Sequence, residues 1–300
     1  MSNYSEWFEV KRFRSGFYDQ STSLYPADFK KYYEKIPIYL LSGAKTTFSI
    51  TNYVSKYTAD RKTHANALKA KIRDTWGADL HSSFQTWLDS KRLASTFAGH
   101  GLPEEISMIA SYAAYCGYKS EGEMANWMNS VFGLDCNGFV SAYFTALKTF
   151  KKPLYYIPSY PHHAGYAKEE NEITYDSVIC FARKKTKLVK GDEDGDGIIE
   201  DGERIRVETK DWEVRPNPGN SAHIMVIDDW VNKWETLKVT QMSATYKLDT
   251  HLYDVVDAPT VKKKRRAVFK IRRRGSTKKI DVMISKQMPE WLGKDGKIEE

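Results

Sequence analysis

The segment Gly133-Leu-Asp-Cys-Asn-Gly-Phe-Val-Ser-Ala-Tyr-Phe144 carries the strongest structural signal in this sequence. Within it and just after it, Phe139, Tyr143 and Leu147 recur every four residues. Apolar residues at this spacing lie on one face of an α-helix, so they predict a buried helix over residues 136–150.

The first turn of this predicted helix contains a cysteine. Asp135 is of a type that favours the N-cap position, so Cys136 meets free amide N–H groups and the positive end of the helix dipole. We therefore expect the pKa of Cys136 to be lowered. Gly138 has no side chain and leaves room for another backbone at the same turn. These residues alone fit either a nucleophile or a buried, inert thiol.

The rest of the chain changes character along its length. Apolar residues spaced three or four apart predict helices over residues 59–76, 82–93 and 104–118. From residue 174 onward, short alternating runs predict strands at 176–182, 223–228, 237–243, 267–273 and 280–285. Helices followed by antiparallel strands indicate an α+β fold.

Composition sets further limits. The chain has 300 residues, and its 46 Lys and Arg against 39 Asp and Glu give a net charge of +7. Eleven of the basic residues lie within residues 261–280, so the rest of the chain carries a net charge of −4. No run reaches the ~18 apolar residues of a membrane span, and the N-terminus shows no apolar core of a secretory signal. Three cysteines are too few for a disulfide framework.

The motif at the helix start resembles that of a known family. The sequence DCNGFVSAYF of residues 135–144 is similar to the DCSGFV-type signature of the NlpC-type cell-wall peptidases, a branch of the papain-like cysteine peptidases. The resemblance implies that Cys136 is the nucleophile and that His223, at the start of a later strand, is the base. Gln241, on the next strand, is the best match for the polar residue that orients the imidazole. The implied fold is a papain-like hydrolase domain, with a central helix packed on an antiparallel sheet.

The sequence departs from the family pattern at three points, one of which is the long spacing to His223 caused by an insertion between Ala182 and Ala222. Asn137 stands where the signature has serine, and the Tyr-x-x-Gly-Gly segment that usually precedes the cysteine is absent. Tyr115 or Tyr118 is the expected substitute for the tyrosine on the oxyanion side.

The resemblance covers roughly residues 104–285 and suggests a division of the chain. Residues 1–100 are expected to form a mainly helical N-terminal domain of unknown role. Residues 101–290 are expected to form the hydrolase domain, with an insertion at about 183–220, followed by a tail over 291–300.

The insertion contains a candidate calcium loop. Residues 192–203, DEDGDGIIEDGE, match the twelve-residue EF-hand loop. The expected calcium ligands are Asp192, Asp194, Asp196, the carbonyl of Ile198, and Glu203. The flanking residues 186–190 and 204–207 read as strands rather than EF-hand helices, so we expect a structural clamp and not a sensor.

Three functions remain open at this stage. The first is a cysteine hydrolase that cuts peptide stems of bacterial peptidoglycan outside the cytosol, whether secreted, periplasmic or carried by a phage particle as a lysin. The second is a papain-like acyltransferase or amidase on another substrate. The third is a polyanion-binding or nucleic-acid-binding protein that uses residues 261–280. We expect that segment instead to form a terminal hairpin, turning near residues 275–278, whose basic residues protect a sheet edge and contact anionic cell-wall polymers.

Overall fold

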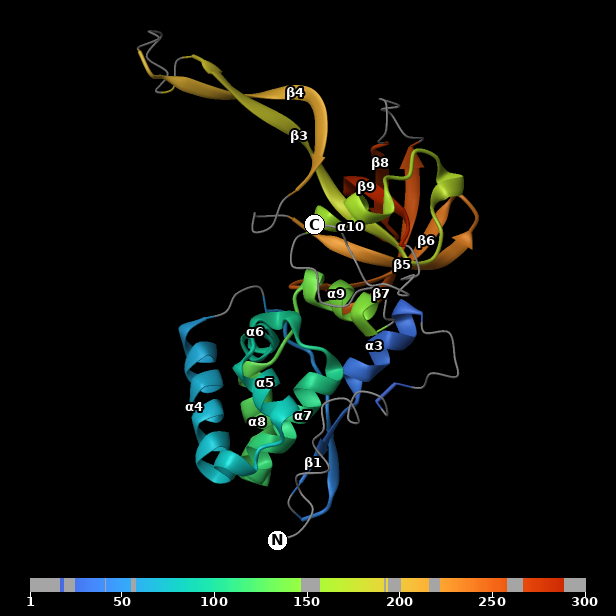
Figure 1. The fold of residues 1–300 in the computed structure, drawn as a ribbon. Helices are drawn as coiled ribbons and strands as arrows, with labels where there is room; N and C mark the ends of the chain where they lie inside the picture. Colours follow the sequence, from blue (N-terminus) through green and yellow to red (C-terminus); the bar gives the residue numbers. More distant parts are fainter. Residues whose placement is uncertain are drawn as a thin grey trace.

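The computed structural model describes residues 17–18, 25–40, 42–54, 58–146, 157–191, 193, 201–215, 222–257 and 267–288. Helices gather at one end of the molecule and a large antiparallel sheet at the other (Figure 1). Helix α9 (Cys136–Ala146) lies between them. The predicted α+β class is confirmed.

The predicted helices are present, but one of them is divided into two. Residues 82–93 form two helices because the Ser90 hydroxyl accepts the N–H of Arg92 and caps a new one. Helix α8 was not predicted, and it begins with a capping box of Ser120 and Glu123. The remaining helices are α3 (Pro26–Glu34), α4 (Ala59–Trp76), α5 (Ser82–Asp89), α6 (Lys91–Ser95), α7 (Pro103–Tyr115), α8 (Glu121–Val131) and α10 (Ser159–Ala164).

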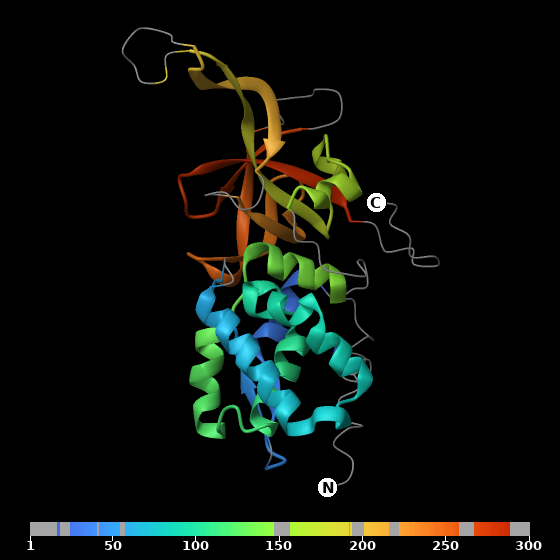
Figure 2. The ribbon, with the colours of Figure 1, turned by 60° about the vertical axis from the view of Figure 1, so that its left-hand side comes forward.

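Six strands close into a barrel. Each is paired with its neighbour in the order β5-β6-β7-β8-β9, and β3 pairs with both β5 and β9 (Figure 2). Alternate residues point to opposite faces, so Ile179 and Met225 fill the barrel while Cys180 and Ile224 pack outside it in the same cluster as α9. The strands are β3 (Ser177–Lys190), β4 (Arg204–Val214), β5 (Ile224–Asn232), β6 (Thr236–Ser243), β7 (Lys247–Asp257), β8 (Phe269–Arg273) and β9 (Lys279–Gln287).

The C-terminal hairpin is present, but its predicted place at a sheet edge is wrong. Phe269 pairs with Val282 and Ile271 with Ile280, as the two arms of the expected hairpin. Strand β7, which the sequence did not predict, pairs with β8, and β3 pairs with β9. Both arms are therefore interior strands, and their basic residues do not protect an edge.

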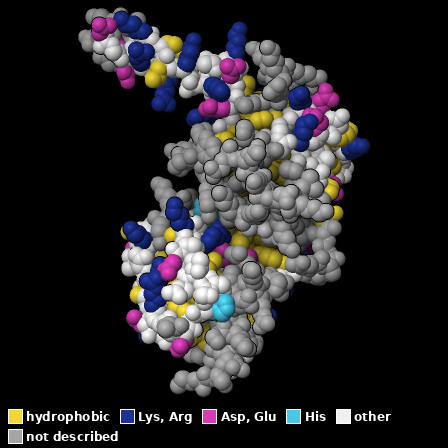
Figure 3. Space-filling model, viewed as in Figure 1, with side chains coloured by type: hydrophobic (Ala, Val, Ile, Leu, Met, Phe, Trp, Pro, Cys, Tyr) yellow, Lys and Arg dark blue, Asp and Glu magenta, His cyan; other side chains and the backbone are white. Residues whose placement is uncertain are grey.

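Strands β3 and β4 continue beyond the barrel as a two-stranded ribbon that protrudes from the molecule (Figures 1 and 3). The register runs to the pair Lys190 and Arg204. The strands predicted on both sides of the calcium loop are confirmed. The described residues that flank the predicted loop therefore lie at the far end of the ribbon, away from the barrel.

The N-terminal third packs on both the helices and the barrel. Asp228 of β5 accepts the N–H of Ala27 at 2.5 Å, which caps the start of α3. A second sheet, of β1 (Ile36–Tyr39) and β2 (Lys45–Phe48), lies against α7, where the Ser111 hydroxyl accepts the N–H of Tyr39 at 3.1 Å. One cluster of buried side chains extends from Phe29 to Met288. The division of the chain at residue 100 stays a prediction.

Candidate active site

The candidate site is built on the start of α9. Cys136 is the first residue of this helix and is only 4% exposed. Asp135 caps the helix, because its Oδ1 accepts the N–H of Gly138. The predicted N-cap is confirmed, and it fixes the backbone from which the thiol projects.

A second turn of backbone packs directly onto the helix start. The Gly99 carbonyl accepts the N–H of Asp135 at 3.2 Å. A Cβ added at Gly138 would lie 1.8 Å from that carbonyl oxygen, so no side chain fits there. Gly99 itself has a φ of +95°, which favours glycine. The room predicted at Gly138 is thus used by the turn over residues 96–100.

The Cys136 sulfur lies beside the start of β5. It accepts the backbone N–H of Ile224, the residue that follows His223. Burial, followed by the charge of Asp135, raises the pKa of Cys136 to about 12. The predicted lowering is therefore wrong, since the loss of water around the thiolate outweighs the amide N–H groups at the helix start. The resting thiol is neutral.

His223 and Gln241 meet on neighbouring strands. His223 Nε2 lies 2.6 Å from Gln241 Oε1, and the Gln241 amide nitrogen donates to the Tyr253 hydroxyl at 2.8 Å. An amide oxygen only accepts, so Nε2 of His223 carries the proton and Nδ1 is the basic nitrogen. Burial lowers the pKa of His223, against the opposing effect of the Gln241 bond, so the imidazole is neutral near pH 7. The ring also packs against Phe181, at 5.1 Å between ring centroids.

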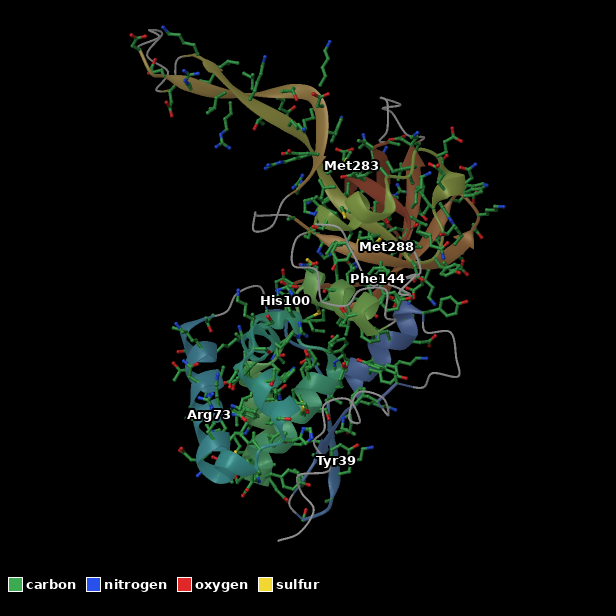
Figure 4. The ribbon with its side chains drawn as sticks, viewed as in Figure 1. Tyr39, Arg73, His100, Phe144, Met283 and Met288 are labelled. Carbon is green, nitrogen blue, oxygen red and sulfur yellow. The ribbon has the colours of Figure 1, made fainter. Side chains whose placement is uncertain are left out.

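His100 joins the site without having been predicted. Its Nε2 lies 3.3 Å from Asp135 Oδ2, and it sits at the end of the helical region that faces α9 (Figure 4). Burial lowers the pKa of His100 to about 4 and raises the pKa of Asp135 to about 7. The contact depends on how the turn over residues 96–100 docks on α9, which local sequence does not reveal.

The tyrosine beside the thiol also differs from expectation. Burial, followed by the charges of Cys136 and Asp135, raises the pKa of Tyr53 to about 12, which places this side chain within electrostatic range of the sulfur. The Tyr118 hydroxyl instead contacts His64 Nδ1 at 3.0 Å, and Tyr115 packs at the end of α7. Tyr53 is brought to the helix by a bridge with Leu134, a long-range pairing with no sequence motif.

Most of the predicted calcium ligands lie outside the described residues. These are Asp192, Asp194, Asp196 and Ile198, whereas Glu203 immediately precedes β4 at the tip of the ribbon. Within the part of the chain that the structure describes, no three acidic, histidine or cysteine side chains gather as a metal site. Calcium binding stays a prediction.

The basic C-terminal segment is partly neutralised where it is described. Lys270 pairs with Asp281, Arg272 and Arg274 pair with Asp254, and Lys279 pairs with Asp257. Residues 261–266 lie outside the described part. Among the described helices, none combines the length and apolar character needed to cross a membrane.

The structure thus brings His223 and Gln241 together and sets Cys136 against the residue next to His223. It adds Tyr53 within electrostatic range of the thiol and His100 against Asp135. No match to the chain is found among models of protein families, curated proteins or solved structures. The chemistry of the site therefore has to be inferred from its own residues.

Proposed function

We propose that the protein is a cysteine hydrolase of papain-like architecture that cleaves amide bonds in the peptide stems of bacterial peptidoglycan. The observation that carries this proposal is the combination of a thiol at the start of a buried helix and an oriented imidazole at the start of the adjoining strand. The Cys136 sulfur accepts the backbone N–H of Ile224, the residue that follows His223, and this supports pairing the thiol and the imidazole as nucleophile and base.

The residues have distinct parts in the proposed reaction. His223 Nδ1 accepts the Cys136 proton while the sulfur attacks the carbonyl carbon, which gives a tetrahedral oxyanion and an imidazolium. The imidazolium then donates this proton to the amine nitrogen as the C–N bond breaks. A water molecule hydrolyses the resulting thioester, with His223 again accepting a proton, and the free thiol returns.

The electrostatics favour proton transfer during attack rather than before it. Because burial raises the pKa of Cys136 and lowers the pKa of His223, a resting thiolate–imidazolium pair is disfavoured. We assign stabilisation of the oxyanion to the backbone N–H groups at the start of α9 and to the Tyr53 hydroxyl.

The substrate class comes from the resemblance of residues 135–144 to the NlpC-type signature. A papain-like acyltransferase would use the same thiol and imidazole with another acceptor than water. The ion pairs of residues 270–279 weigh against a polyanion-binding function for that part of the basic segment, since four of its six cations already face carboxylates.

Digestion of purified sacculi tests the function. Wild-type protein with calcium is expected to release muropeptides whose masses identify the cleaved bond, and Cys136→Ala is expected to release none. Cys116→Ala is the matched control, because Cys116 is also a buried thiol but lies at the end of α7, where it contacts the Ala113 carbonyl. Muropeptide profiles that wild-type protein leaves unchanged would reject the peptidoglycan substrate.

A further inference from the structure

The amide of Gln241 has a second partner that the family resemblance did not suggest. Gln241 is 1% exposed on β6, and its amide nitrogen donates to the hydroxyl of Tyr253 at 2.8 Å. Tyr253 is 3% exposed on β7 and belongs to the cluster that fills the barrel. His223, Gln241 and Tyr253 therefore form a hydrogen-bonded series that runs from the site into the barrel.

The strand register explains how a residue so far along β7 reaches the site. Gln241 pairs with Asp249, and Tyr253 is four residues further along, opposite Leu237. Residues an even number of positions apart on a strand share a face, so both side chains point into the barrel. The length of the tyrosine side chain carries its hydroxyl back to the Gln241 amide.

The orientation of this amide controls which nitrogen of His223 is basic. With the amide oxygen toward His223, the proton lies on Nε2 and Nδ1 is free to accept the thiol proton. If the amide turned over, its NH2 group would donate to Nε2, and the ring proton would move to Nδ1. An imidazole in that form has no lone pair left at Nδ1 to accept a proton from the thiol.

We propose that Tyr253 is a positioning residue that holds the Gln241 amide with its oxygen toward His223 and so selects the tautomer that acts as a base. The proposal rests on the proposed function for its catalytic consequence. Without the tyrosine oxygen, the buried NH2 group loses its acceptor. A buried N–H without an acceptor is rarer in proteins than a buried carbonyl without a donor. The amide is therefore more stable when it turns over, so that its NH2 group donates to the imidazole.

The tautomer is measured directly by 15N NMR of the histidine ring at a pH above the pKa of His223. The wild type is expected to show a proton on Nε2, and Tyr253→Phe is expected to show a substantial fraction with the proton on Nδ1. Release of muropeptides by Tyr253→Phe is expected to fall about tenfold, the loss that a single hydrogen bond of ordinary strength produces. Tyr246→Phe is the control, because it removes the same hydroxyl group from an exposed tyrosine whose ring packs against Arg273 rather than inside the barrel.

Two results overturn the proposal. One is a wild-type spectrum with the proton on Nδ1, which needs no variant and so remains decisive if Tyr253→Phe does not fold. The other is a folded Tyr253→Phe protein with an unchanged tautomer. Failure of the wild type to digest sacculi would instead reject peptidoglycan as the substrate. The role of Tyr253 is tested separately, because the tautomer of His223 is measured without any substrate.

Discussion

The close approach of two backbones at Gly138 makes the substitution Gly138→Ala informative. The added methyl would lie 1.8 Å from the Gly99 carbonyl oxygen, and the atom in its way is backbone, not a mobile side-chain end. The turn over residues 96–100 must therefore move away from α9. That movement breaks the 3.2 Å bond between the Gly99 carbonyl and the Asp135 N–H.

Three contributions determine how much Gly138→Ala changes the free energy of unfolding. Overpacking costs about 1–3 kcal/mol, and the broken hydrogen bond costs about 1 kcal/mol. Replacing glycine by alanine within a helix returns up to about 1 kcal/mol. The free energy of unfolding is therefore expected to fall by about 1–4 kcal/mol.

A second helical glycine provides the control. Gly122 in α8 has no atom within 4 Å of an added Cβ, so Gly122→Ala is expected to stabilise the protein by up to about 1 kcal/mol. Urea unfolding followed by circular dichroism measures both variants, with the midpoint and the slope compared to wild type. A Gly138→Ala protein as stable as wild type, or stabilised like Gly122→Ala, would refute the packing that we describe at the site.

Three further predictions concern charge. Because burial raises the pKa of Cys136 to about 12, iodoacetamide is expected to label this thiol more slowly at pH 7 in the folded than in the unfolded protein. The labelling rate of the folded protein is expected to increase as the pH rises. Peptide mapping by mass spectrometry measures the rate, and equal rates for folded and unfolded protein at pH 7 would contradict the prediction. Burial raises the pKa of Asp135 from an ordinary 3.8 to about 7, so the folded protein binds this proton more tightly than the unfolded chain does. The contribution of the proton to the free energy of unfolding is therefore lost as the pH rises from about 4 through 7. Asp135→Asn cannot ionise and still accepts the Gly138 N–H, so its urea midpoint should fall less than that of wild type between pH 4 and pH 8; parallel curves would argue against a buried, protonated Asp135. Calcium is expected to raise the melting temperature of wild type but not of Asp194→Asn, and a melting temperature of the wild type that does not respond to calcium would reject the loop as a binding site.

Local pattern predicted the helix that begins at Cys136 and most of the strands of the barrel. Phe139 and Tyr143 recur with helical spacing, and strands β5 and β6 have runs of buried apolar residues. Strand β7 was missed because its residues are mostly half-buried and polar, without clear alternation. Its place between β6 and β8, which closes the barrel, depends on pairings between distant segments.

The remaining differences at the site have the same origin. Tyr53 reaches the start of α9 through a bridge to Leu134, and His100 reaches Asp135 through the docking of a turn on α9. Neither contact is encoded in adjacent residues. The pKa of Cys136 was predicted from the helix start alone. Desolvation depends on every element packed around the thiol, and it raises the pKa of Cys136 where the helix start alone would lower it.

The candidate site is assembled from separate parts of the described chain. Gly99 and His100 hold the N-cap of α9, and His223, the proposed base, precedes β5, whose Asp228 caps α3. The N-terminal elements therefore contribute to the geometry of the thiol, whatever else they bind. In the proposed reaction, a neutral thiol has little nucleophilicity at rest, so attack requires a carbonyl group held against the start of α9 while the proton moves to His223. This coupling would confine the chemistry of Cys136 to a correctly placed substrate and protect the thiol from small electrophiles in solution.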